Sequence, residues 1–190
     1  MLEKFKYIVL TPLRKASLLA LIALLLSAGN THASGSAKEA VNKGMEYGKQ
    51  GKFNEAITEF NKAIEIDPNS YNAYFNRGIA HKYVGDYDQA IVDYSKVVEI
   101  NPKADNAYTN RGNIYAEKGD YDRAISDYNR AIEINPNPKL ANAYSNRGEA
   151  YFYKKNYNKS WEDINKAESL GNKIDSALFE KLKKASGRDK

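Results

Sequence analysis

The chain has 190 residues, of which 42% are hydrophobic and 28% charged, and it contains no cysteine. This composition is typical of a globular protein, and the lack of cysteine excludes disulfides, thiolate catalysis and cysteine-ligated metal sites. The formal net charge is +5, of which +3 lies in residues 1–33. The small basic excess that remains does not predict a nucleic-acid-binding protein.

Residues 1–33 have the pattern of a secretory signal peptide. A basic start precedes an unbroken apolar run over residues 16–26, and small residues follow, ending in the cleavage triplet 31–33. The alternative is an uncleaved membrane anchor, but the apolar run is shorter than the roughly 20 residues of a spanning helix. We therefore expect a periplasmic or secreted protein, cleaved before Ser34, with residues 34–36 as a short linker. Any membrane contact would be through an uncleaved signal segment.

The rest of the chain repeats with a period of 34 residues. Glycine, alanine and proline recur in one phase, at Gly44, Gly78 and Gly112, at Ala56, Ala90 and Ala124, and at Pro68, Pro102 and Pro136. Gly148 follows after 36 residues, which places a two-residue insertion at Lys139-Leu140. The predicted units are 37–70, 71–104, 105–138 and 141–174.

Each unit contains two apolar segments at helical spacing, joined by a short turn. In the second unit the turn is Gly85-Asp86, and Asp86 with Gln89 forms a capping box that opens the second helix. This helix ends before Asn101-Pro102, because proline cannot continue a helix. An isolated helical hairpin cannot bury its apolar faces, so the units must stack on one another.

The units resemble the tetratricopeptide repeat at its eight signature positions. These are Ala40, Lys43, Gly44, Tyr47, Ala56, Phe60, Ala63 and Pro68 in the first unit; Tyr74, Arg77, Gly78, His81, Ala90, Tyr94, Val97 and Pro102 in the second; Tyr108, Arg111, Gly112, Tyr115, Ala124, Tyr128, Ala131 and Pro136 in the third; and Tyr144, Arg147, Gly148, Tyr151, Ser160, Ile164 and Ala167 in the fourth. The fourth unit departs at Asn172, which replaces the proline, and at Lys155, which replaces the turn glycine. The resemblance implies an all-α, right-handed superhelix of four repeats, with residues 175–190 as a C-terminal capping helix and tail.

Two recurring patterns are interpreted as packing. Eleven tyrosines lie at signature positions or at the start of second helices: Tyr47, Tyr74, Tyr87, Tyr94, Tyr108, Tyr115, Tyr121, Tyr128, Tyr144, Tyr151 and Tyr157. Arg77, Arg111 and Arg147 are each followed sixteen residues later by an aspartate, and in the first unit Lys43 is followed by Glu59. Because base and acid change together, we predict an ion pair between the two helices of each repeat.

A third pattern is interpreted as function. Asparagine recurs on one face of each first helix, at Asn42, Asn72, Asn76, Asn106, Asn110, Asn142 and Asn146. Asparagine is a poor helix former, and its amide can both donate to and accept from a peptide backbone. The series resembles the asparagine ladder of O-linked sugar transferase solenoids, which implies a concave peptide-binding groove. The alternative is that duplication copied a tolerated residue.

Further groove candidates share this helical phase: Val41, Met45, Phe75, Ile79, Thr109, Asn113, Ser145 and Glu149, with Tyr83 and Tyr153 as exposed aromatic contacts. They are apolar in the first two units and polar in the last two. Chaperone-tail binders with this fold hold a terminal carboxylate with a clamp of lysine and arginine. The groove positions here carry asparagine and apolar residues instead, so we do not predict binding of such tails.

We expect a non-catalytic scaffold that binds a partner protein or peptide, with no cofactor, small-molecule substrate or nucleic acid. His81 is the only histidine after residue 33, and it occupies a packing position of the repeat. Catalytic arrangements that need a free histidine, such as a serine–histidine pair or a histidine-bound metal, are therefore not predicted. Two alternatives remain: a structural solenoid that self-associates, and a groove that binds an oligosaccharide.

Overall fold

The computed structural model describes residues 35–135 and 141–188, and every regular element in these ranges is a helix. Residues 35–49 form the first helix. The others are α2 (Phe53–Ile66), α3 (Tyr71–Tyr83), α4 (Tyr87–Ile100), α5 (Asp105–Glu117), α6 (Tyr121–Ile134), α7 (Ala141–Tyr153), α8 (Tyr157–Ser169) and α9 (Ser176–Ser186). The predicted all-α fold is confirmed. The predicted signal peptide and the insertion Lys139-Leu140 lie outside the described residues.

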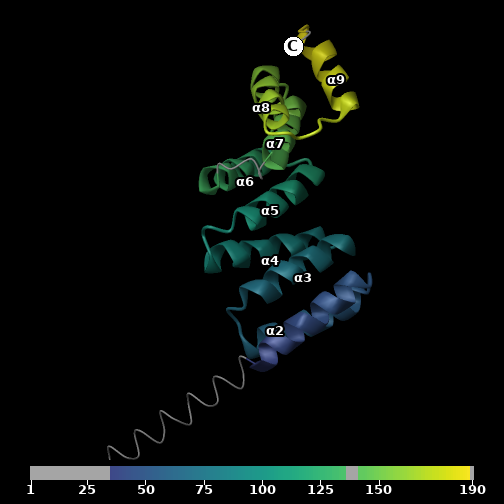
Figure 1. The fold of residues 1–190 in the computed structure, drawn as a ribbon, viewed down its shortest axis with the longest axis vertical. Helices are drawn as coiled ribbons and strands as arrows, with labels where there is room; N and C mark the ends of the chain where they lie inside the picture. Colours follow the sequence, from purple (N-terminus) through teal and green to yellow (C-terminus); the bar gives the residue numbers. More distant parts are fainter. Residues whose placement is uncertain (1–34, 136–140, 189–190) are drawn as a thin grey trace, which may run out of the picture.

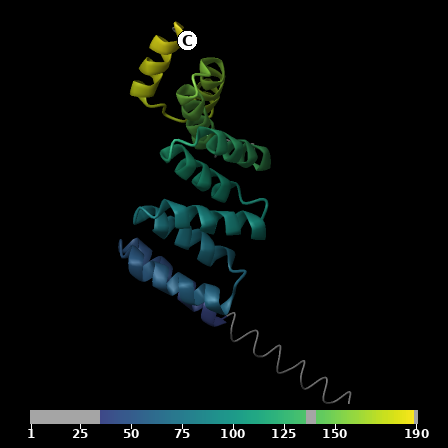
Figure 2. The same cartoon turned by 180° about the vertical axis from the view of Figure 1, so that it is seen from behind.

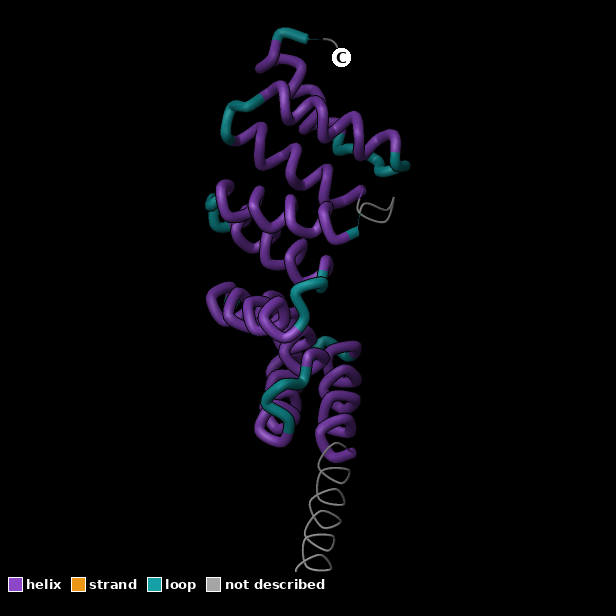
Figure 3. The backbone as a smooth tube through the Cα atoms, turned by 90° about the vertical axis from the view of Figure 1, so that its left-hand side faces the viewer, coloured by secondary structure: helices purple, strands orange, loops and turns teal. Residues whose placement is uncertain are grey.

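The helices stack one on the next in chain order, from the helix at residues 35–49 at one end to α9 at the other (Figure 1). The reverse view shows the same ladder of antiparallel helices (Figure 2). Seen from the side, the helices change direction along the stack, which gives the array its superhelical twist (Figure 3). The core is accordingly a series of apolar clusters between successive helices, as expected of a solenoid.

The repeated glycines lie where the two helices of a repeat cross. A β-carbon added at Gly112 would lie 2.8 Å from Cε1 of Tyr128, and one at Gly44 would lie 2.5 Å from Cε1 of Phe60. In the first three repeats an aromatic ring of the second helix therefore fills the space that a side chain on the first would need, and in the fourth repeat Ile164 does so. This close approach explains why the glycine keeps the same phase in every repeat.

The turns between the helices follow the predicted chemistry. The side chain of Asp86 accepts a hydrogen bond from the backbone N–H of Gln89, and Asp120 accepts one from Arg123, so both act as N-caps. Gly85 ends the preceding helix with a φ of 82°. In the fourth repeat the same left-handed conformation is adopted by Lys155, at a φ of 58°. A side chain at this position is strained, because a β-carbon is disfavoured in the left-handed region.

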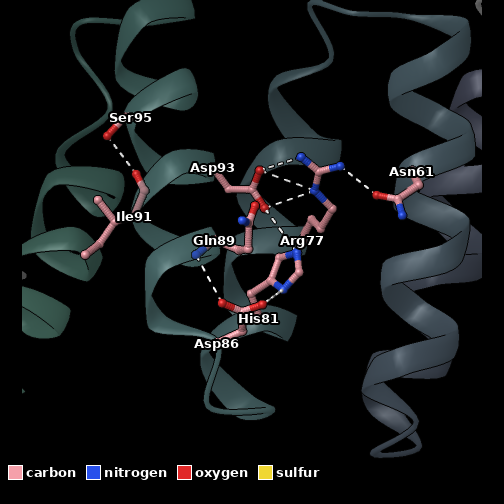
Figure 4. A network of polar contacts seen from close by, with 8 residues as sticks. All are labelled: Asn61, Arg77, His81, Asp86, Gln89, Ile91, Asp93 and Ser95. Carbon is pink, nitrogen blue, oxygen red and sulfur yellow. Dashed lines mark hydrogen bonds and ion pairs between the residues drawn. The ribbon is translucent and has the colours of Figure 1, made fainter.

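The predicted ion pairs are confirmed and extend further than predicted. Arg77 Nη2 lies 2.6 Å from Asp93 Oδ1, and Asp93 is 1% exposed. Nη1 of Arg77 also donates to Oδ1 of Asn61 on α2, the second helix of the preceding repeat, at 2.6 Å (Figure 4). Arg111 and Arg147 make the same pair of contacts, reaching back to Ser95 and Asn129. Each arginine thus holds three helices together.

The helix α9 covers the last repeat. Leu182 is fully buried, and the ring of Phe179 packs edge-on against Trp161 at 5.2 Å. The indole N–H of Trp161 donates to Oγ of Ser186 at 2.9 Å. These contacts bury an end of the core that would otherwise face solvent.

Candidate partner-binding groove

Four hollows follow the first helices of the repeats and share lining residues. Hollow 1 is lined by Ala37, Lys38, Val41, Asn42, Met45, Asp67, Ser70, Asn72 and Asn76. Hollow 2 is lined by Met45, Gly48, Lys49, Phe53, Ala56, Phe60, Asn76, Ile79, Ala80 and Tyr83. Hollow 3 is lined by Ile79, Lys82, Tyr83, Tyr94 and Asn110. Hollow 4 is lined by Lys82, Asn113, Ala116, Glu117, Tyr121, Tyr128, Asn146, Glu149, Ala150 and Tyr153.

Hollows that share residues form one continuous surface. Hollows 1 and 2 meet at Met45 and Asn76, hollows 2 and 3 at Ile79 and Tyr83, and hollows 3 and 4 at Lys82. On each first helix the lining residues include a series spaced three or four positions apart, such as Asn72, Asn76, Ile79 and Tyr83 on α3, and such a series lies on one face. We call this surface the groove.

Most of the predicted groove residues line these hollows. They are Val41, Asn42, Met45, Asn72, Asn76, Ile79, Tyr83, Asn110, Asn113, Asn146, Glu149 and Tyr153. Five others do not line them: Phe75, Asn106, Thr109, Asn142 and Ser145. The ring of Phe75 packs edge-on against Tyr94 at 5.8 Å, and Oδ1 of Asn106 accepts from the hydroxyl of Tyr71 at 3.0 Å.

Several asparagines have partners inside the protein. The hydroxyl of Tyr128 donates to Oδ1 of Asn113, and that oxygen also accepts from Nδ2 of Asn146, both at 2.8 Å. Asn110 lies beside Tyr94 of the preceding repeat, and both line hollow 3. Because a buried hydroxyl needs a partner, these asparagines have a packing role that the sequence interpretation lacked. Asn76 differs, because its amide donates to the carbonyl of Asn72 in the same helix, at 2.7 Å.

Two stacked aromatic pairs border the groove. Tyr83 lies parallel to Phe53 with ring centroids 4.5 Å apart, and Tyr153 stacks on Tyr121 at 5.1 Å. Both outer rings remain accessible, since Tyr83 is 68% and Tyr153 49% exposed. The eleven tyrosines predicted to pack are all buried or half-buried. The separation of packing from exposed tyrosines is therefore confirmed.

Sequence reasoning missed two charged residues of the groove, Lys82 and Glu117. Lys82 on α3 pairs with Glu117 on α5 at 3.0 Å, and both line hollow 4. Glu149 lines the same hollow, and burial raises its pKa, with Asp175 adding to the rise and Lys181 opposing it. Lys82 and Glu117 lie three and four positions beyond Ile79 and Asn113. The helical phase, followed one turn further, would have found them.

The described residues contain neither a cluster of metal ligands nor a membrane-spanning helix. No group of three or more histidine, aspartate or glutamate side chains within residues 35–135 and 141–188 is arranged to hold a metal ion. Over the same ranges, no helix has the length and apolar character needed to cross a membrane.

Comparison with known proteins decides the family. The profile described as tetratricopeptide repeat matches residues 71–104 and 106–138, and the profile described as TPR repeat matches residues 44–85. The chain belongs to the tetratricopeptide repeat family. Proteins of this family are in general non-catalytic scaffolds for protein–protein interaction.

Solved structures share the fold of this tetratricopeptide repeat protein. A crystal structure of MamA has a TM-score of 0.69 and 23% identity, over 86% of this chain and 96% of MamA. PilF of Pseudomonas aeruginosa also has a TM-score of 0.69, with 19% identity over 81% of this chain and 69% of PilF. The first tetratricopeptide domain of Spaghetti (RPAP3), bound to the HSP90 peptide SRMEEVD, has a TM-score of 0.53 and 32% identity, over 55% of this chain and 82% of that domain. No curated protein matches the chain in sequence.

Proposed function

We propose that this protein is a non-catalytic adaptor of the cell envelope, exported by its N-terminal signal peptide, which holds a segment of a partner protein in the groove. The observation that carries this proposal is the continuity of the four hollows along the first helices of all four repeats. A continuous surface suits a polypeptide segment better than a compact small molecule, which needs an enclosing pocket.

Two further observations support the proposal. Of the large hydrophobic side chains that are exposed, Met45, Tyr83 and Tyr153 all line the groove. Exposed aromatic and methionine side chains are enriched in the cores of protein interfaces. The 32%-identical RPAP3 domain holds a peptide, which is the class of ligand proposed here.

The structure argues against the self-stacking alternative. In the inner repeats the face toward the preceding repeat is apolar, with Ala73 and Ala80 almost fully buried. The same positions of the first repeat carry Glu39 and Glu46, which are exposed. Burying these charges against another molecule would be costly without basic partners. At the other end, α9 already covers the last repeat.

Site-specific photocrosslinking tests the groove. A photoreactive phenylalanine analogue replaces Tyr83 or Tyr153 in the groove, or Val92 on α4 as the control. Val92 is 57% exposed and lines none of the four hollows. We expect both groove positions to crosslink to one partner in intact cells, and Val92 to give no such product. Crosslinking from Val92 alone would move the interaction to the opposite surface.

The envelope location needs a separate measurement. N-terminal sequencing of the protein from fractionated cells should start at Ser34 in the periplasmic or secreted fraction. If the chain is membrane-bound and keeps its first residues, the N-terminal segment is an uncleaved membrane anchor and not a cleaved signal peptide. A cytoplasmic chain would contradict export altogether.

A further inference from the structure

The chemistry of the groove changes from one end to the other. Four residues occupy the same position in successive repeats and all line the hollows: Met45, Ile79, Asn113 and Glu149. Two are apolar, one is neutral and polar, and the last is acidic. A partner segment that lies along the groove therefore meets an apolar environment in repeats 1 and 2, and an acidic one in repeats 3 and 4.

The apolar end is hollow 2. Phe53, Ile79 and Tyr83 form its walls, and Lys49 and Asn76 are the only polar side chains among its lining residues. The hollow has a volume of about 260 Å³. An apolar side chain placed there would be removed from water on several sides, which stabilises a complex by ~25 cal/mol for each Å² buried.

The acidic end is hollow 4, of about 400 Å³. Its charged lining residues are Lys82, Glu117 and Glu149. Lys82 is already paired with Glu117, so the hollow keeps one carboxylate in excess. The pKa of the buried Tyr128 hydroxyl is raised, mainly by burial and also by the carboxylates of Glu149 and Glu117. The excess carboxylate favours a cation over an anion in the hollow.

Aromatic rings add to this preference. Tyr121 and Tyr153 stack on one another at 5.1 Å and both line hollow 4. The face of an aromatic ring attracts a cation through its quadrupole. A carboxylate beside stacked tyrosines therefore suits a lysine or arginine side chain, whereas an aspartate or glutamate would be repelled by Glu149.

We infer that the groove selects an extended segment with an apolar side chain in hollow 2 and a lysine or arginine side chain in hollow 4. This inference rests on the proposed function and specifies its ligand. Hollow 2 lies between the first helices of repeats 1 and 2, and hollow 4 between those of repeats 3 and 4. Hollow 3 lies between them, since it shares Ile79 and Tyr83 with hollow 2 and Lys82 with hollow 4. The two side chains are therefore separated by several residues of the extended segment.

A random peptide library displayed on phage tests this pattern. Selection against the purified protein should enrich peptides that carry lysine or arginine at a constant spacing of several residues from leucine, isoleucine, methionine or phenylalanine. A synthetic peptide from this set and its variant with glutamine in place of the basic residue are then measured by fluorescence anisotropy. The basic peptide should bind at least about tenfold more tightly, the equivalent of one charge-assisted contact.

Matched protein variants locate each end of the peptide. Glu149→Gln should abolish the difference between the basic and the glutamine peptide, while it leaves the glutamine peptide's affinity unchanged. Ile79→Ser should weaken both peptides equally. Glu162→Gln is the control, because Glu162 is exposed on α8 and lines none of the hollows. Circular dichroism checks that each variant keeps its helix content.

The outcomes separate this inference from the proposed function. Groove-binding peptides without a basic preference, or with an acidic one, would overturn the inference while leaving the adaptor proposal intact. Equal loss of the basic preference in the Glu162→Gln variant would also overturn it. If no peptide is retained and the photocrosslinks lie outside the groove, both proposals fall.

Discussion

Nη1 of Arg77 donates a hydrogen bond to the side-chain oxygen of Asn61, at 2.6 Å, across the boundary between two repeats. The same guanidinium pairs with Asp93 within its own repeat. One side chain thus fixes the two helices of its repeat and seats that repeat on its neighbour. The groove runs across these boundaries, so its shape depends on contacts of this kind.

Removal of this arginine should destabilise the protein strongly. In an Arg77→Met variant the carboxylate of Asp93, which is 1% exposed, would lose its partner. Leaving a buried charge unpaired costs about 3 kcal/mol or more. The measurement is the free energy of unfolding from urea titrations followed by circular dichroism.

Lys43→Met is the control at the same position of the first repeat. The Lys43 side chain is 53% exposed, and its partner Glu59 also pairs with Lys62 at 2.9 Å. An exposed ion pair contributes less than about 1 kcal/mol. Equal losses in the two variants would contradict the role assigned to burial.

His81 should make stability depend on pH. His81 occupies the position of a tyrosine in the other repeats. Its Nδ1 is buried without a hydrogen-bond partner. Burial lowers the pKa of His81, although the carboxylates of Asp93 and Asp86 oppose this effect. Above pH ~6.5 the histidine is neutral in both states and has no effect on the pH dependence. As pH falls below that value the unfolded chain takes up the proton first, so the free energy of unfolding decreases until the folded state is protonated too.

A His81→Tyr variant should lose this pH dependence, because tyrosine carries no charge in the range. The measurement compares the unfolding free energies of the two proteins between pH 7.5 and 5. Carboxylates titrate alike in both, so their difference isolates the histidine. A constant difference over the whole range would refute a lowered pKa for His81.

Lys155→Gly should stabilise the fourth repeat. Lys155 has a φ of 58°, where the earlier repeats have the turn glycines Gly51, Gly85 and Gly119. The left-handed conformation costs a residue with a β-carbon about 1 kcal/mol. The urea midpoint should rise by a corresponding amount. Lys155→Ala, which also removes the charge but keeps the β-carbon, should give no such rise.

Detachment of α9 should be visible in the fluorescence of Trp161. Leu182 is fully buried, and truncation of a buried leucine costs about 2–5 kcal/mol. In a Leu182→Ala variant the emission of Trp161 should therefore move to longer wavelength at lower urea than in the unchanged protein. Glu180→Ala, at an exposed position of the same helix, should leave that transition where it was. Coincident curves for the two variants would show that α9 does not depend on Leu182.

The sequence by itself determined the fold of this protein and the repeated residues that pack its helices together. Short-range chemistry is enough for this, because the proline and the aspartate cap act within a few residues and the glycine acts within its own repeat. The arginine–aspartate pairs could be predicted too, since both partners lie in one repeat and change together. Helical phase placed most of the groove residues, but not Phe75, Asn106 or Asn142.

Only the tertiary structure decided how neighbouring repeats share side chains. Asn110 faces Tyr94, and Asn113 joins Tyr128 to Asn146, so part of the asparagine series serves packing between repeats. The pairing of Lys82 with Glu117 and the acidic character of hollow 4 likewise depend on how one repeat rotates against the next. That rotation is set by the sum of many contacts across each boundary, and no local pattern of residues encodes it.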